Sequence, residues 1–151
     1  MSSRWAGLAG LWLVVFCLRA GAATPGQEAA ADPAMRSTAA GVYSDAQAKA
    51  GQEIFAVTCI GGCHNMADHR GLAFKQRWDG RLVWDLFNTI LVKMPKDDPG
   101  SLSDDDAIQL VAYLLKLNGL PAGKDDLSTD PTALKKIKIE LPATYEETHQ
   151  W

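Results

Sequence analysis

The sequence lacks the features that define several large protein classes. Three cysteines in 151 residues are too few for a disulfide-rich scaffold. No apolar run reaches the length of about 18 residues that a membrane-spanning helix needs. The central part has no second Cys and His pair, which a four-ligand zinc site would require. The formal net charge of −3 argues against a nucleic-acid partner.

Residues 1–23 have the pattern of a secretory signal peptide. Arg4 forms a short positive n-region, residues 5–18 form an apolar run of 14 residues, and residues 20–22 (Ala-Gly-Ala) form a small-residue cleavage site. The run is short for a membrane span, so an uncleaved anchor is the alternative reading. We therefore expect Sec-type export to the periplasm. Cleavage would remove two arginines and no acidic residue, which makes the net charge more negative still.

The rest of the chain divides by composition into three parts. Residues 24–43 are rich in Ala, Pro and Gly with few large apolar groups, so we expect a flexible leader. Residues 44–123 contain the helical patterns and are expected to form one small all-α domain. Residues 124–151 contain no further strong core pattern, and we expect a C-terminal extension that wraps on the domain and ends in a loose tail.

The first helix is predicted to begin near Ser44 and to run to Cys59. Ser44 and Gln47 match a capping box. One apolar stripe repeats at helical spacing, and Gly51 and Phe55 form a second i, i+4 pair; the stripe consists of Ala46, Ala50, Ile54 and Val57. Glycine inside a helix is unfavourable by about 1 kcal/mol, so Gly51 predicts a second helix crossing closely at that point.

Two more helices are predicted further along. One follows Asp79 and has apolar residues at i, i+3, i+4 and i+7, which are Val83, Leu86, Phe87 and Ile90. The last begins after the N-cap Ser103 and ends at Asn118-Gly119. It is apolar on two sides and must therefore be covered on two sides. The polar stretch 65–77 is predicted to be irregular.

The motif Cys-Ile-Gly-Gly-Cys-His over residues 59–64 carries the chemistry. Two thiols followed at once by an imidazole are the arrangement that attaches a haem covalently and gives its iron one axial ligand. The usual spacer has two residues and this one has three, so one residue must be looped out. Gly61 and Gly62 permit that, because glycine reaches positive φ without a steric penalty. Two thiols this close would otherwise form a disulfide in an oxidising compartment.

Met94-Pro95 offers the second axial ligand. A thioether is a soft ligand suited to haem iron, and Pro95 fixes the backbone beside it. Met94 lies 30 residues after His64, which is enough chain to pass around a haem edge and return on the other face. The alternative for Met94 is a methionine that fills the core. His69, which we expect to be an exposed loop histidine, and His149, near the chain end, are the weaker ligand candidates.

Over roughly residues 43–123 the sequence resembles the class I c-type cytochromes. The features that match are Gly51 and Phe55, the Cys59, Cys63 and His64 motif, Met94-Pro95, and Ala112-Tyr113-Leu114. The stretches 78–95, 99–103 and 112–123 resemble in particular the cytochrome domains that serve periplasmic dehydrogenases, including quinoprotein alcohol dehydrogenases. The resemblance implies an all-helical fold whose first and last helices cross near Gly51 and Tyr113. It also implies one haem c bound covalently to Cys59 and Cys63, with His64 and Met94 as axial ligands.

Such a site predicts an electron carrier rather than an enzyme. An iron with imidazole on one face and thioether on the other has no open position for a substrate, and Met ligation raises its potential. No candidate general base or nucleophile stands beside the motif. We therefore predict a periplasmic monohaem cytochrome that takes single electrons from a periplasmic dehydrogenase and passes them to a cytochrome or terminal oxidase.

Two alternatives come from different classes. In the first, Met94 is labile and the haem binds peroxide or a gas, which would make the protein an enzyme or a sensor. In the second, the protein is a haem-free binding module in which Cys59 and Cys63 form a disulfide, or join His64 and His69 on a metal.

Overall fold

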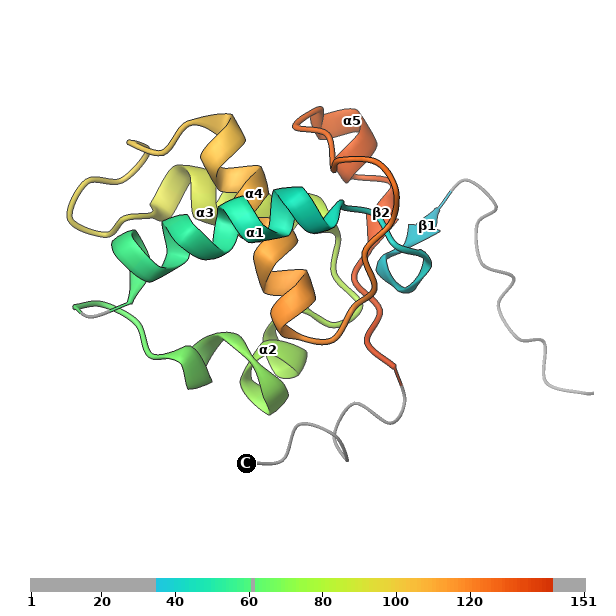
Figure 1. Ribbon diagram of the computed structural model, residues 1–151, viewed down its shortest axis with the longest axis horizontal. Helices are drawn as coiled ribbons and strands as arrows, with labels where there is room; N and C mark the ends of the chain where they lie inside the picture. Colours follow the sequence, from blue (N-terminus) through green and yellow to red (C-terminus); the bar gives the residue numbers. More distant parts are fainter. Residues whose placement is uncertain (1–34, 61, 143–151) are drawn as a thin grey trace, which may run out of the picture. The chain divides into compact units, whose positions relative to one another are not determined.

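A computed structural model describes residues 35–60 and 62–142, which all belong to one unit of the chain. The elements follow in the order β1 (Arg36–Ser37), η1 (Thr38–Ala40), α1 (Asp45–Ile54), η2 (Phe55–Cys59), η3 (Met66–His69), α2 (Gly71–Trp78), α3 (Val83–Lys93), α4 (Asp104–Leu117), α5 (Pro131–Leu134) and β2 (Ile137–Lys138). The fold is all-α apart from one pair of two-residue strands, as predicted (Figure 1). Among the helices of the described residues, none has both the length and the apolar character needed to cross a membrane. The predicted signal peptide and His149 lie outside the described residues.

α1 and α4 cross at Gly51, as the sequence predicted. A Cβ built on Gly51 would lie 1.9 Å from the carbonyl oxygen of Gln109 in α4, far inside van der Waals contact. Phe55, one turn further on, packs against Tyr113 with ring centroids 5.2 Å apart. The missing side chain of Gly51 is therefore what lets the two backbones approach.

The buried face of α1 is not the apolar stripe that we predicted. The helix begins where expected, because Ser44 Oγ accepts a hydrogen bond from the Gln47 N–H at 3.1 Å. Its buried residues, however, are Gln47, Ala48 and Gly51, while Val57 at the end of the stripe is 85% exposed. At the close crossing the inner face carries the small residues Ala48 and Gly51, so hydrophobicity alone points to the wrong side of this helix.

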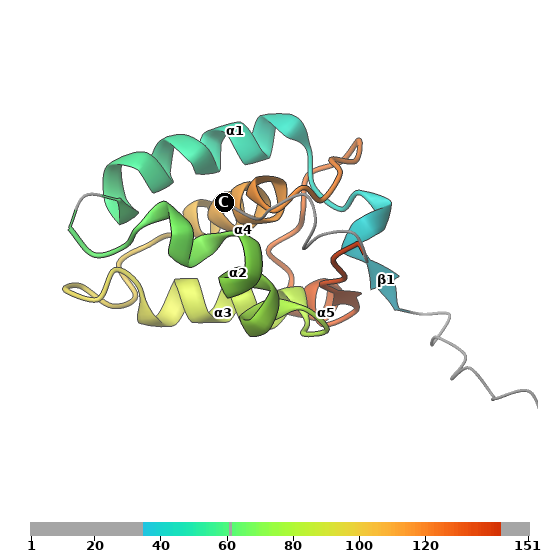
Figure 2. The ribbon, with the colours of Figure 1, turned by 90° about the horizontal axis from the view of Figure 1, so that it is seen from below.

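α4 is the central helix, and Figure 2 shows it between α1 and α3. Ser103 caps it by accepting the Asp106 N–H at 3.1 Å. Eight of its residues are buried, and they cover both predicted apolar sides: Ala107, Ile108, Leu110, Val111, Ala112, Tyr113, Leu114 and Leu115. α1 packs on one side of the helix, and Leu110 and Leu114 line a pocket on another.

α3 confirms the predicted second helix, since Val83, Leu86, Phe87 and Ile90 are all buried. α2 was not predicted, and the expectation of an irregular stretch over 65–77 is wrong. Only Phe74 and Trp78, one helical turn apart, anchor the hydrophobic side of α2. A helix of eight residues with two apolar anchors carries too little periodicity to be recognised in a sequence.

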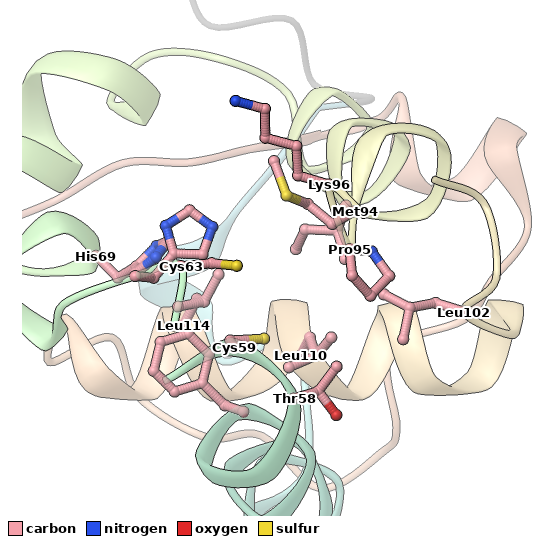
Figure 3. A pocket seen from close by; sticks show the side chains of 13 residues that line it. Thr58, Cys59, Cys63, His69, Met94, Pro95, Lys96, Leu102, Leu110 and Leu114 are labelled. Carbon is pink, nitrogen blue, oxygen red and sulfur yellow. The ribbon is translucent and has the colours of Figure 1, made fainter. Parts of the chain in front are cut away.

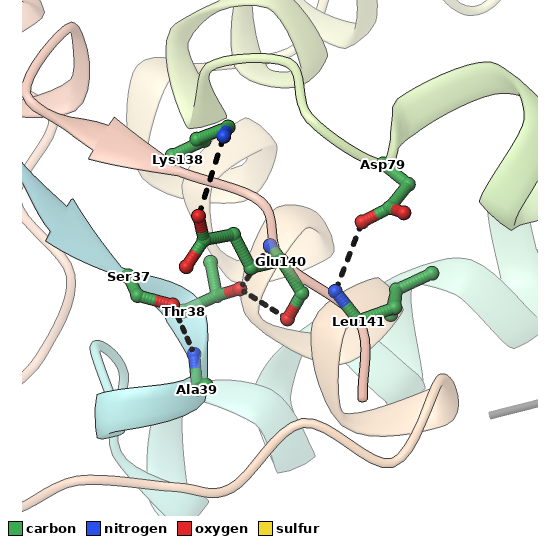
Figure 4. Close-up of polar contacts among 7 residues, drawn as sticks. All are labelled: Ser37, Thr38, Ala39, Asp79, Lys138, Glu140 and Leu141. Atoms are coloured by element: carbon green, nitrogen blue, oxygen red, sulfur yellow. Dashed lines mark hydrogen bonds and ion pairs between the residues drawn. The ribbon is translucent and has the colours of Figure 1, made fainter. Parts of the chain in front are cut away.

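The segments before α1 and after α4 pack together. β1 pairs in parallel with β2, and the Thr38 hydroxyl oxygen accepts the Glu140 N–H at 3.0 Å (Figure 4). Val42 and Tyr43 are buried. We expected a flexible leader over 24–43, but its described part, residues 35–43, is held by these strand and side-chain contacts.

The C-terminal segment is fixed to α1 by a buried side chain. The Gln47 amide donates to the Leu127 carbonyl at 2.9 Å and accepts the Leu127 N–H at 2.8 Å. The Tyr43 hydroxyl donates to the Leu120 carbonyl at 2.6 Å. Gln47 therefore does not complete the predicted capping box with its side chain; it binds the backbone of the extension.

Candidate haem site

A pocket opens between η2, the loop that follows it, the end of α3, and α4. Its lining includes Cys59, Cys63, His64 and Met94, all four of the residues predicted to hold the haem. Figure 3 shows the sulfur atoms of Cys59, Cys63 and Met94 directed toward a common space, with Leu110 and Leu114 of α4 behind it.

The Cys59–His64 loop absorbs its extra residue within one closed turn. The π-helical turn η2 ends with a hydrogen bond from the Ile60 N–H to the Phe55 carbonyl at 3.1 Å. The His64 N–H then donates to the Cys59 carbonyl at 3.2 Å, so this bond spans five residues. A Cβ on Gly62 would meet nothing within 4 Å, so the loop bulges into open space there. Gly61 lies outside the described residues.

The two cysteines differ in environment. Cys59 is half-buried and Cys63 is exposed, and both are free thiols in this structure. Burial raises the pKa of the Cys59 thiol, and the neighbouring Cys63 raises it further. A thiol in an apolar environment holds its proton and is less reactive as a thiolate.

Met94 reaches the pocket from the end of α3. Its N–H donates to the Ile90 carbonyl at 3.1 Å as the last hydrogen bond of that helix, and Pro95 prevents the helix from continuing. The side chain is half-buried. Lys96 and Leu102 also line the pocket. We did not predict these two residues, although their closeness in sequence to Met94 was a usable signal.

His69 occupies a different place from the one expected. It is half-buried, not exposed, and its ring lies 4.6 Å from the ring of His64 in a T-shaped contact. His69 also lines the pocket, together with His64. Burial lowers the pKa of His69, with a further lowering by His64.

The donor set and the walls fit a haem. Two thiols beside an imidazole, with a thioether nearby, match the covalent and axial attachments of haem c. The remaining walls are apolar and include Phe55, Ile90 and Leu102. No group of three or more His, Cys, Asp or Glu side chains that could hold a separate metal ion occurs within residues 35–60 and 62–142.

Comparison with known families agrees with this fit. Residues 46–114 match the family described as cytochrome C oxidase, cbb3-type, subunit III. This match supports a class I c-type cytochrome domain over residues 46–114, and the matched segment contains the whole Cys59–His64 motif and Met94. Cytochromes of this kind bind haem c and generally carry electrons. Searches among curated proteins and among solved structures each gave no match.

Proposed function

We propose that this protein is a periplasmic monohaem cytochrome that passes single electrons from a periplasmic dehydrogenase to a downstream cytochrome or terminal oxidase. One observation carries the proposal: Cys59, Cys63, His64 and Met94 line one apolar pocket, although Met94 is 30 residues distant from His64 in sequence. A shared ligand would explain why two thiols, an imidazole and a thioether converge between apolar walls.

Each residue has a distinct role in this proposal. Cys59 and Cys63 would hold the haem covalently, and His64 and Met94 would bind its iron. When bound, haem c supplies a redox centre that gains or loses one electron. Phe55, Leu110 and Leu114 exclude water from the pocket, which lowers the reorganisation that accompanies a change of charge. With His64 and Met94 both bound to the iron, no coordination position would remain for a substrate.

The first experiment tests covalent attachment. The full chain is produced in a bacterial host that matures c-type cytochromes, and the exported protein is examined by intact mass and by haem staining after denaturing electrophoresis. We expect one haem per chain and loss of the signal peptide. Peptide mapping identifies which thiols are bonded. A colourless protein containing a Cys59–Cys63 disulfide would overturn the proposal.

The second experiment tests the axial ligands. We expect a six-coordinate, low-spin spectrum, and we expect Met94→Ala to convert it to a high-spin spectrum with rapid binding of carbon monoxide by the ferrous form. Met66→Ala is the matched control, because Met66 is 37% exposed and approaches Tyr113, not the pocket lining. Rapid carbon monoxide binding by the unaltered protein would favour a labile Met94, and therefore the alternative of a peroxide- or gas-binding protein.

The third experiment tests the direction of electron flow. Purified periplasmic dehydrogenases of the quinoprotein class are mixed with the oxidised protein and their substrate, and haem reduction is followed by stopped flow. We expect reduction to be fast with the physiological donor and to depend on ionic strength, since exposed charges steer such encounters. Equal, slow rates with every donor would contradict the assignment to a dehydrogenase.

A further inference from the structure

His69 is held firmly beside His64 by contacts on three sides. Its backbone carbonyl accepts a hydrogen bond at 2.8 Å from the side-chain amide of Asn118, a fully buried residue that follows α4. Its ring stands edge-on to Phe55 with centroids 5.2 Å apart and an interplanar angle of 90°. The contact with His64, at 4.6 Å and 74°, forms the third side. His69, the last residue of η3, is held in this way from η2 and from the end of α4, and is therefore not a solvated surface residue.

One ring nitrogen of His69, Nε2, lacks a hydrogen-bond partner among the described residues. Its Nε2 atom is buried and makes no hydrogen bond within the described part of the chain. A buried polar atom without a partner is unfavourable, and native structures contain few of them. Of the two rings that His69 touches, Phe55 offers no N–H group, while His64 carries one on whichever nitrogen does not bind a metal.

We propose that His69 is a positioning residue for His64 and that, in the haem-loaded protein, its Nε2 accepts a hydrogen bond from the free ring N–H of His64. This inference rests on the proposed function, because it takes His64 as an iron ligand. Metal-ligating histidines almost always donate their second N–H to a fixed acceptor, which sets the ring orientation and raises the basicity of the ligand. A neutral imidazole keeps one ring nitrogen as an acceptor.

The consequence is a lower reduction potential. A more basic imidazole stabilises the ferric state more than the ferrous state, so the hydrogen bond favours the oxidised protein. Mutation of such supporting partners typically costs about tenfold or more in metal affinity or activity, and we expect an effect of about tenfold on the redox equilibrium. A tenfold shift of the ferric to ferrous equilibrium corresponds to about 59 mV for one electron.

The test compares two variants of the haem-loaded full chain by redox titration. His69→Phe keeps a flat ring against Phe55 and His64 but removes the acceptor. We expect the ferric to ferrous equilibrium of this variant to shift about tenfold toward the ferrous form, so that its reduction potential rises. His69→Gln places an amide oxygen near the position of Nε2, and we expect it to return most of the shift. Tyr113→Phe is the control, because Tyr113 also packs on Phe55 and its loss of a hydroxyl leaves the His64 environment unchanged.

A measurement on the unaltered protein keeps the test independent of how the variants fold. In the ferrous protein with ¹⁵N-labelled histidine, we expect a slowly exchanging ring N–H on His64 and an unprotonated Nε2 on His69. Unchanged potential in His69→Phe, or a rapidly exchanging His64 N–H, would overturn the inference. Loss of the low-spin spectrum in His69→Phe would indicate that His69 itself binds the haem iron. That result would also overturn the inference. Absence of covalent haem from the unaltered protein would refute the proposed function itself.

Discussion

Replacement of Gly51 by alanine tests whether the α1–α4 crossing depends on a missing side chain. The new Cβ would lie 1.9 Å from the Gln109 carbonyl oxygen and 2.4 Å from its carbonyl carbon. Both are backbone atoms of a central helix and cannot rotate away, so the helices must move apart. Overpacking of this kind is unfavourable by about 1–3 kcal/mol, and the clash with backbone places this site at the upper end of that range.

Alanine also favours the helix by about 1 kcal/mol relative to glycine. The net loss expected for Gly51→Ala is therefore about 2 kcal/mol. For a domain of this size, that loss lowers the midpoint of thermal unfolding by about 10 °C. The measurement is thermal and urea unfolding of the haem-loaded protein followed by far-ultraviolet circular dichroism.

Two controls separate the clash from the substitution itself. Gln52→Ala changes an exposed neighbour on the same helix, and we expect an effect within about 0.5 kcal/mol. Gly62→Ala introduces the same methyl group where nothing lies within 4 Å, and its stability should change equally little. A Gly51→Ala protein as stable as the unaltered one would show that the crossing is looser than described, and the packing argument would fail.

Two further predictions concern the segments around the helices. Gln47→Leu leaves the buried N–H and carbonyl of Leu127 unpaired. We therefore expect the free energy of unfolding in urea to fall by about 2 kcal/mol and hydrogen exchange at the Leu127 amide to become faster. Unchanged exchange would contradict the role of Gln47. Burial, with a smaller effect of the Asp45 charge, raises the pKa of Tyr43 to about 12. The stabilisation from neutral Tyr43 is complete below the ordinary tyrosine pKa of about 10 and is lost as the pH rises toward 12. The free energy of unfolding should therefore fall over this interval, and Tyr43→Phe should flatten that dependence; an equally steep fall in the variant would refute it.

The sequence predicted the elements that carry strong local signals. The capping residues Ser44 and Ser103 start helices where expected, and α3 and both apolar sides of α4 follow from helical periodicity. Gly51 was informative because a glycine inside a helix needs an external reason. The sequence also predicted four residues that line the pocket: Cys59, Cys63, His64 and Met94. Their roles as haem attachments and iron ligands stay predictions.

What the sequence did not predict depends on contacts between distant segments. α2 is fixed by Phe74 and Trp78 through the tertiary core, and its own residues give little pattern. Residues 36–43 become ordered because β2, a hundred residues later, supplies the partner strand. His69 was expected to be exposed, but its burial is decided by Phe55 and Asn118, which no local pattern connects with it.

The pairing of β1 with β2 has a practical consequence for handling the molecule. These strands begin and end the described fold next to one another, and neither contributes a residue to the lining of the pocket. A tag, a fusion partner or an electrode linker joined next to β1 or β2 would therefore be attached at strands that do not line the pocket.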